Sequence, residues 1–371
     1  MKVLLYSGSQ QLIERSGVGR AIYHQKEALA QNQVEYTTDV KDDWDIAHIN
    51  TIFPGSFLLS RRARRQGKKI VYHGHSTEED FRNSFIGSNL VAPLFKKWLT
   101  LCYRQGDIIV APTPYAKKLI DNYHTGRPVV SISNGIDLSF YQRDEAAGRA
   151  FREKYGFTEQ DKVVLSVGLP IDRKGILDFI ELARRLPRYQ FVWFGDLDVP
   201  MIPLHIKEAL KTKLPNLHFP GYIRKEELRD AYSGSDVFLF LTKEETEGIV
   251  LLEALAMRCP VLVRDIPIYE DWLTDGQQVY KASDVEGFAG RLISMLEGPL
   301  KETLPGVLEA GYQVARERSI DSVGWQLARE YRHLMEPMPV PVALGRQKRL
   351  SGFGRREVAL LQKAVASFLN E

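Results

Sequence analysis

The feature that most constrains this chain is a repeated alternation of short apolar runs with helix-length segments. Before residue 139, the runs of strand length are residues 2–6, 46–50, 69–73, 107–111 and 129–133. After residue 150 the alternation begins again, with runs at residues 162–168, 190–195, 216–221, 236–241 and 259–264. Strands that alternate with helices form parallel sheets that are covered by helices. The sequence therefore predicts an α/β fold with two doubly wound units.

A charged polar segment at residues 139–150 separates the two units. We expect a Rossmann-like N-terminal domain over residues 1–145 and a second over residues 146–336, facing it across a cleft. Residues 337–371 are basic and are expected to form a connector followed by a short amphipathic helix. Packing of this helix on the protein, contact with a membrane, and disorder are the open alternatives.

Composition places the chain among ordinary soluble proteins, because 44% of its 371 residues are apolar and 26% are charged. Its two cysteines, Cys102 and Cys259, are far apart in sequence, which argues against a structural disulfide and fits a reducing cytoplasm. No apolar run reaches the roughly 18 residues that a membrane span needs. The opening segment lacks the features of a signal peptide. We expect a cytoplasmic protein, at most peripheral on a membrane.

Net positive charge lies at both ends of the chain, in residues 1–150 and 338–371, although the net charge of the whole chain is only +3. Residues 61–69 alone hold six cations. Residues 89–104 combine cations with large apolar side chains: Lys96, Lys97, Leu94, Trp98 and Leu101. Such a surface, if exposed, would bind an anionic membrane. A buried helix flanked by solvated charge is the alternative.

A glycine-rich segment, SGVGR, follows the first predicted strand and opens the first predicted helix. Gly17 and Gly19 allow backbone N–H groups to approach an anion at the helix N-terminus. A dinucleotide-binding fingerprint is disfavoured because Ile22 stands where its third glycine should be. A plain tight turn remains the alternative.

Two histidines and a serine lie at or just beyond the end of the third predicted strand. His73, His75 and Ser76 occupy the edge where ligand sites of parallel sheets collect. Metal binding by the histidines is disfavoured, because no further Cys or His lies nearby at a standard spacing. We expect at least one histidine in an active site, with a purely structural role as the alternative.

The segment EETEGIVLLEALA at residues 244–256 carries the strongest chemical signal. It places Glu245 in a loop and Glu253 on the following helix, where both carboxylates can meet hydroxyl groups. The N–H groups at the start of that helix could bind an anion; they belong to Gly248, Ile249 and Val250. The pattern is typical of a site for a phosphorylated sugar, and an ordinary amphipathic helix is the alternative.

Two cations, Arg173 and Lys174, follow the first predicted strand of the second unit and precede Gly175. Arginine pairs with phosphate oxygens through a planar fork, whereas lysine acts as a point charge. The pair could bind a phosphate, and solvated surface charge is the alternative.

Together these motifs resemble the retaining glycosyltransferases of family 4, which have the GT-B fold. The resemblance covers residues 1–335 and rests on six motifs in chain order: SGVGR, the strand-end His73, SNGID, RKG, PGYI, and the Glu245/Glu253 pair. Longer segments, such as HGHSTEEDF and NGIDLSFY, are similar to Gram-positive enzymes that add a second hexose to monoglucosyl-diacylglycerol. Those enzymes make the glycolipid anchor of lipoteichoic acid.

The resemblance implies roles for residues of the second unit. Glu253 matches the glutamate that binds the ribose, Glu245 the glutamate that contacts the donor hexose, and Lys174 the lysine that binds the diphosphate. The family's arginine after the strand-end glycine is replaced by Leu169, and Arg173 is a candidate to supply its charge.

Further matches concern the nucleobase and the first unit. Tyr222 and Ile223 match the segment that meets the nucleobase, expected to be uracil. Gly17 and Gly19 match the loop that faces the diphosphate and the reacting sugar. His73 matches the family's active-site histidine best, with His75 as the alternative.

The resemblance implies transfer of a hexose from UDP-glucose or UDP-galactose to a glycolipid, expected to be monoglucosyl-diacylglycerol, at the inner face of the cell membrane. It makes residues 1–145 the acceptor-binding domain and residues 146–336 the nucleotide-sugar-binding domain. A soluble or polysaccharide acceptor, and a nucleotide-sugar-binding protein without turnover, are the alternatives. No cofactor, metal or nucleic-acid partner is expected. Two acidic pairs, Asp43/Asp45 and Asp196/Asp198, are interpreted as loop carboxylates. The linkage position and the oligomeric state stay open.

Overall fold

The computed structural model describes residues 1–8, 16–196 and 202–336, and it contains two parallel six-stranded sheets. The first sheet has the strand order β2-β1-β3-β4-β5-β6. Its strands are β1 (Lys2–Tyr6), β2 (Glu35–Thr37), β3 (Ile46–Ile49), β4 (Lys69–His73), β5 (Ile108–Ala111) and β6 (Val129–Ser131). Its helices are α2 (Gly17–Gln31), α3 (Pro54–Arg65), α4 (Glu78–Phe81), α5 (Ser88–Tyr103) and α6 (Pro114–Asp121). We call this sheet with its helices the first lobe.

The second sheet has the order β12-β11-β10-β7-β8-β9. Its strands are β7 (Lys162–Val167), β8 (Tyr189–Phe194), β9 (Leu217–Gly221), β10 (Val237–Phe240), β11 (Val261–Arg264) and β12 (Tyr280–Ala282). The helices that follow residue 144 are α7 (Glu145–Tyr155), η1 (Asp172–Lys174), α8 (Ile176–Arg185), α9 (Leu204–Ala209), α10 (Lys225–Gly234), α11 (Ile249–Ala256), η2 (Pro267–Tyr269), α12 (Val285–Leu296), α13 (Leu300–Glu317) and α14 (Ile320–Met335). This sheet and its helices, apart from α14, form the second lobe.

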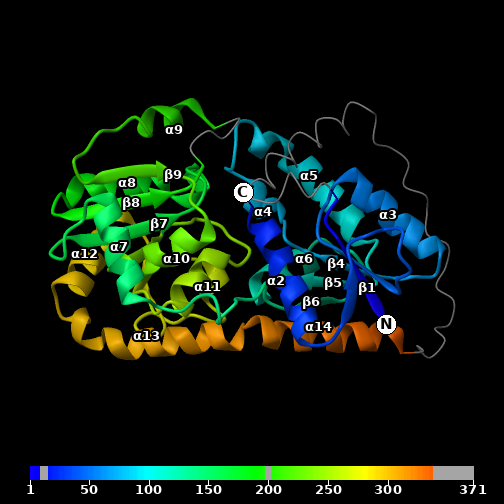
Figure 1. Ribbon diagram of the computed structural model, residues 1–371. Helices are drawn as coiled ribbons and strands as arrows, with labels where there is room; N and C mark the ends of the chain where they lie inside the picture. The colour runs from blue at the N-terminus through cyan, green and yellow to red at the C-terminus, as the bar shows by residue number, and fades with distance from the viewer. Residues whose placement is uncertain (9–15, 197–201, 337–371) are drawn as a thin grey trace.

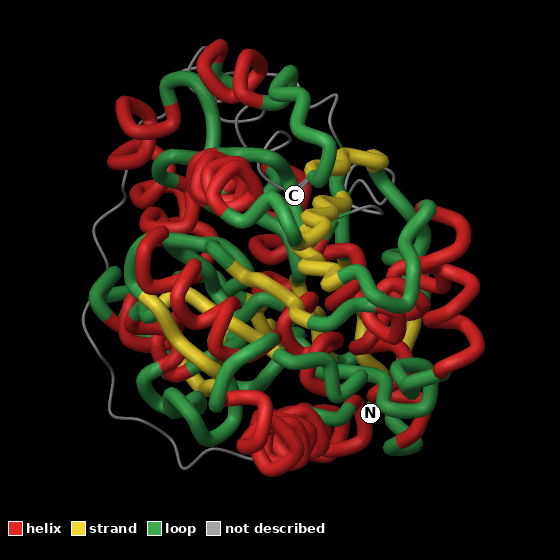
Figure 2. The backbone as a smooth tube through the Cα atoms, turned by 90° about the vertical axis from the view of Figure 1, so that its left-hand side faces the viewer, coloured by secondary structure: helices red, strands yellow, loops and turns green. Residues whose placement is uncertain are grey.

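The two lobes lie side by side, each with helices on both faces of its sheet (Figures 1 and 2). The central strands explain why the sequence shows continuous apolar runs, since every residue of β3, β5, β10 and β11 is buried. The α/β fold expected from the alternation is confirmed. The short outer strands β2 and β12 escaped prediction, because three residues form no recognisable run.

The last described helix, α14, crosses back from the second lobe to the first (Figure 1). Its buried face, with Val323, Leu327 and Tyr331, shares a core cluster with Val3 and Leu5 of β1. The sequence-based division had grouped α14 with residues 146–336, because periodicity cannot show which sheet a helix covers. The connector and helix predicted for residues 337–371 lie outside the described residues.

Helix α5 packs differently from the exposed face that its sequence suggested. Trp98 is buried, against expectation, and its indole N–H donates to the carbonyl of Ile52 at 2.7 Å. Its ring also contacts Phe57 of α3, with 5.5 Å between the ring centroids. Lys96 is paired with Glu78 at 3.0 Å. Helix α5 therefore contributes its aromatic residues to the core of the first lobe.

Among the described helices, none combines the length and the apolarity required to cross a lipid bilayer. Cys102 and Cys259 are both buried free thiols.

Candidate active site

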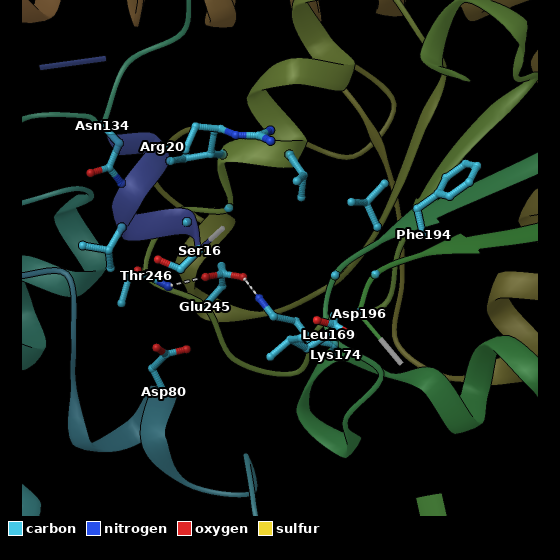
Figure 3. Close-up of a pocket in the computed structure, with 18 of the residues that line it drawn as sticks. Ser16, Arg20, Asp80, Asn134, Leu169, Lys174, Phe194, Asp196, Glu245 and Thr246 are labelled. Atoms are coloured by element: carbon cyan, nitrogen blue, oxygen red, sulfur yellow. Dashed lines mark hydrogen bonds and ion pairs between the residues drawn. The ribbon is translucent and has the colours of Figure 1, made fainter. Parts of the chain in front are cut away.

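A cleft opens between the lobes, where the carboxyl ends of the central strands of both sheets meet. The strand order of the first sheet reverses beside β1 and β3, and that of the second beside β7 and β10. Ligands of doubly wound sheets bind at such reversals, because the loops diverge there. From the first lobe and the segment joining the lobes, the cleft is lined by Ser16, Gly17, Val18, Arg20, His75, Ser76, Asp80 and Asn134. From the second lobe it is lined by residues that include Leu169, Lys174, Asp196 and Glu245 (Figure 3). Tyr222, Ile223 and Ile249 of the same lobe line it as well.

Lys174 and Glu245 point toward each other across the floor of the cleft (Figure 3). Their ammonium and carboxylate groups lie 2.6 Å apart. Gly175 has φ +81° and lies so close to Leu241 that a Cβ would meet the Leu241 carbonyl at 2.5 Å. This tight contact holds the segment with Lys174 against the loop with Glu245, which explains why glycine follows the two cations.

The charge state of Glu245 follows from these neighbours. Burial alone would raise the pKa of Glu245, but Lys174 and Arg173 together lower it. Glu245 is therefore an ionised carboxylate that can accept hydrogen bonds from hydroxyl groups.

Arg173 borders the cleft but is only 2% exposed. Its guanidinium lies 2.7 Å from the carboxylate of Asp80 in the first lobe, and it donates to Ser84 Oγ at 3.0 Å. It also donates to the carbonyl of Glu244 at 3.0 Å. Arg173 therefore joins the two lobes, and its contacts do not favour the role of a cation available to a leaving phosphate.

Glu253 is fully buried on α11, and hydrogen bonds reach both of its carboxylate oxygens. Tyr141 donates to Oε1 at 2.8 Å and Tyr232 donates to Oε2 at 3.0 Å. Arg20, from α2 of the first lobe, forms an ion pair with Oε1. The sequence predicted Glu253 as a ribose ligand, and that role stays a prediction. The structure adds a contact with the first lobe that was not foreseen.

The glycine-rich loop starts α2 at the edge of the cleft (Figure 3). Ser16 caps the helix by accepting a hydrogen bond from the N–H of Gly19 at 3.2 Å. The N–H groups at the first positions of a helix have no intrahelical partner and favour anions. Gly17 and Val18 line the cleft, so this loop is placed to approach a phosphate group.

The two strand-end histidines occupy different depths. His75 lines the cleft, whereas His73 stacks behind it, with 3.9 Å between the ring centroids. His73 Nδ1 lies 3.0 Å from both His48 Nε2 and Gln25 Nε2. His75 Nε2 lies 3.1 Å from Asn50 Oδ1. The geometry favours His75 as the histidine that meets a ligand and gives His73 a supporting position.

Both histidines are neutral at physiological pH. Burial lowers the pKa of His73 to about 3, and burial with the neighbouring His73 and His48 lowers the pKa of His75 well below its usual value. They can exchange hydrogen bonds with a sugar, but they do not add positive charge to the cleft.

The start of α11 forms another part of the wall. Gly248 adopts φ +82°, and a Cβ there would approach the ring of Phe240 to 2.9 Å. This glycine turns the chain so that Ile249 and Val250 border the cleft. Tyr222 also borders the cleft and is 46% exposed.

Comparison with known proteins identifies the family. Residues 148–306 match the family description "Glycosyl transferases group 1", and residues 38–140 match "Glycosyltransferase Family 4". The processive diacylglycerol alpha-glucosyltransferase of Acholeplasma laidlawii is 41% identical over 339 residues, which are 91% of this chain and 99% of that protein. The chain belongs to glycosyltransferase family 4.

A second relative of this glycosyltransferase is the alpha-galactosylglucosyldiacylglycerol synthase of Streptococcus pneumoniae, 24% identical over 73% of this chain and 74% of that protein. Among solved structures, Anabaena HepE in complex with UDP and glucose superposes with a TM-score of 0.68 and 15% sequence identity. The superposition covers 90% of this chain and 99% of that chain. Sucrose-phosphate synthase of Thermosynechococcus elongatus superposes with a TM-score of 0.73 and 15% sequence identity. That superposition also covers 90% of this chain and 99% of the other. These structures confirm the GT-B fold.

Sequence reasoning missed several polar residues of the glycosyltransferase cleft. Arg20 ends the SGVGR motif, and Tyr141 ends the NGIDLSFY segment, so motif boundaries could have drawn attention to both. Asp80 lies in the HGHSTEEDF segment, so a comparable signal was available for it, although its partner Arg173 is distant in sequence. Tyr232 lies in no motif, and its importance comes from a partner in a distant segment.

The acidic pairs of the sequence lie in different surroundings. Asp43 is paired with Lys68 at 2.9 Å, and Asp45 accepts a hydrogen bond from the backbone N–H of Lys2 at 2.8 Å. Asp196 borders the cleft, and Asp198 lies outside the described residues. Within residues 1–8, 16–196 and 202–336, no cluster of three or more Asp, Glu, His or Cys side chains is arranged to bind a metal. The expectation of metal-free chemistry stays a prediction.

Proposed function

We propose that this glycosyltransferase moves glucose from UDP-glucose to monoglucosyl-diacylglycerol with retention of the anomeric configuration. The observation that carries the proposal is the 41% identity to a diacylglycerol glucosyltransferase, which extends over 91% of the chain and so includes both lobes. The residues that we expect to bind the donor lie mainly in the second lobe, and we expect the first lobe to bind the acceptor. UDP-galactose is the alternative donor.

The cleft suggests how the residues would promote the reaction. Breaking the sugar–phosphate bond leaves a nucleoside diphosphate and a sugar with oxocarbenium-like character. Lys174 and the N–H groups of the Gly17–Val18 loop would stabilise the departing negative charge, and Glu245 would orient the hexose through its hydroxyl groups. The acceptor hydroxyl would attack on the face of the leaving group and pass its proton toward the phosphate.

A surface of the first lobe supports a lipid-bound acceptor. Three large apolar side chains are strongly exposed on or near α3 and α5: Leu58 (64%), Ile86 (59%) and Leu90 (87%). Exposed cations accompany them: Arg61, Arg62, Arg65 and Lys97. Helices α3 and α5 are neighbours, because Phe57 packs on Trp98. Apolar groups beside cations favour an anionic membrane surface, where we place the enzyme.

The proposal is tested with purified enzyme and lipid vesicles. UDP-glucose or UDP-galactose would be combined with vesicles that contain diacylglycerol or monoglucosyl-diacylglycerol, and with soluble glucosides as controls. Mass spectrometry of the lipid extract should show diglucosyl-diacylglycerol, and NMR should show an α-linkage. Transfer only to the soluble glucosides would contradict the lipid acceptor, and transfer to unglycosylated diacylglycerol would indicate that the enzyme also performs the first addition.

A further inference from the structure

Arg20 is a cation of the first lobe that faces the donor side of the cleft. It lies on the first turn of α2, directly after the glycine-rich loop, and its side chain is 24% exposed. Its Nη1 atom pairs with Glu253 and lies 3.4 Å from the hydroxyl of Tyr141. Arg20 therefore reaches across the cleft from α2 while its side chain borders the open space (Figure 3).

Among the residues that the structure describes, two further cations line the cleft, and both are held differently. Arg173 is almost fully buried and binds Asp80, Ser84 and the Glu244 carbonyl. The Lys174 side chain is 15% exposed and pairs with Glu245. A diphosphate in the cleft would therefore meet Lys174 from the second lobe and Arg20 from the first.

The chemistry of guanidinium allows Arg20 to keep its present partner and bind an anion. A guanidinium is a planar fork of N–H donors that can serve two acceptors at different edges, unlike the compact ammonium of lysine. Glu253 is itself fixed by Tyr141 and Tyr232, at 2.8 and 3.0 Å, so it holds the Arg20 head group in place. An arginine positioned in this way loses little conformational freedom when it binds phosphate.

The geometry points to Arg20 as a ligand of the donor diphosphate, with Glu253, Tyr141 and Tyr232 as positioning residues. This inference rests on the proposed use of a nucleoside diphosphate sugar and assigns one contact of that donor to the first lobe. Arg20 and Leu169 both line the cleft, so Arg20 would supply positive charge to the same cleft in which the family's arginine is replaced by Leu169.

The test compares two ligands that differ only in the diphosphate, UDP and uridine, by NMR or calorimetric titration of the full chain. Arg20→Gln should weaken UDP binding by about 10- to 100-fold, the usual weight of a charge-assisted bond, and change uridine binding less than about threefold. The UDP affinity of Arg20→Lys should lie between those of the wild type and Arg20→Gln. Lys26→Ala, which removes a cation from the same helix outside the cleft lining, should leave both affinities unchanged.

A second pair of variants guards against misfolding, because Arg20→Gln leaves the buried Glu253 carboxylate without its cation. Arg20→Gln/Glu253→Gln has no unpaired charge and should still bind UDP more weakly than Glu253→Gln alone. Equal losses of UDP and uridine affinity would show that Arg20 acts only through Glu253 and would overturn the inference. Unchanged UDP affinity would overturn it as well.

The outcome also separates this inference from the proposed function. Wild-type enzyme that binds and uses UDP-glucose, while Arg20→Gln binds UDP normally, would refute only the role of Arg20. Wild-type enzyme that binds no UDP would refute both.

Discussion

Arg173 of the second lobe and Asp80 of the first form a buried ion pair, with 2.7 Å between their charged atoms. The pair lies beside Lys174 and Glu245, so the contact that joins the lobes is also part of the wall of the cleft. Burial raises the pKa of Asp80 to about 6, with Arg173 opposing the rise. The contact between the lobes therefore includes two charged groups that are taken out of water.

Removing one partner of this pair should be costly. Arg173→Met leaves Asp80 and the Glu244 carbonyl without their donor, and it should lower the free energy of unfolding by about 3–5 kcal/mol. Asp80→Asn should lower the free energy of unfolding by less, because Arg173 keeps Ser84 and the Glu244 carbonyl as hydrogen-bond acceptors. Lys211→Met, which breaks an exposed ion pair with Glu208, is the matched control and should cost about 0–1 kcal/mol. Urea unfolding of the variants provides the measurement, and equal costs for Arg173→Met and Lys211→Met would refute this account.

Lys174 and Glu245 should affect different parts of the reaction. Lys174→Met removes charge stabilisation from the leaving group and should lower kcat/KM by about 100- to 1000-fold, with weaker UDP binding. Glu245→Gln should lower kcat while UDP affinity stays within about threefold, because UDP lacks the hexose that Glu245 is predicted to contact. Steady-state kinetics and UDP titration distinguish the two effects. A Glu245→Gln variant with full activity would remove Glu245 from the site.

Glu244 should make stability depend on pH. Burial, opposed by Tyr115 and supported by neighbouring carboxylates, raises the pKa of Glu244 to about 7. Because the folded state binds this proton more tightly than the unfolded state, stability from Glu244 falls as pH rises from about 4.5 through 7. Between pH 5 and pH 8, the free energy of unfolding of Glu244→Gln should therefore rise relative to that of the wild type by on the order of 1–2 kcal/mol. Thermal unfolding of both proteins at pH 5 and pH 8 measures this change in relative stability. Glu159→Gln, at an exposed position, is the control. A constant difference in unfolding free energy across this range would argue against a raised pKa of the half-buried Glu244 carboxyl.

The exposed apolar residues of the first lobe should govern vesicle binding. Leu90→Asp removes the most exposed large apolar side chain near α5 and adds a negative charge, so it should weaken binding to anionic vesicles at least tenfold. Leu204→Asp is the matched control, because Leu204 is 71% exposed on the second lobe. Vesicle sedimentation at low and high salt measures the binding of both variants to anionic vesicles. Equal effects of the two substitutions would contradict the assignment of the membrane-facing surface.

Much of the fold could be predicted because buried parallel strands leave continuous apolar runs in the sequence. The strands at residues 2–6 and 69–73 have the predicted bounds. The packing of α14 on the first sheet could not be predicted, since its amphipathic pattern shows only that one face is buried. The burial of Trp98 was missed for the same reason, because a helix with mixed charge and apolar groups fits a core or a membrane equally well.

The candidate site shows a similar division. Lys174, Glu245 and the glycine-rich loop could be singled out because each lies in a local motif, and the structure brings them to one cleft. The partners of Arg20 and Arg173 could not be predicted, since Glu253 and Asp80 are far away in sequence. Local motifs identify the groups that carry charge, whereas tertiary contacts decide which of them remain accessible.

The central claim is that one donor molecule lies between the two lobes, and a crystal structure with UDP bound tests it most directly. The account predicts a diphosphate between Lys174 and the start of α2, with the uracil ring near Tyr222 and the ribose toward α11. UDP bound at any other surface, in a crystal of active enzyme, would contradict the account.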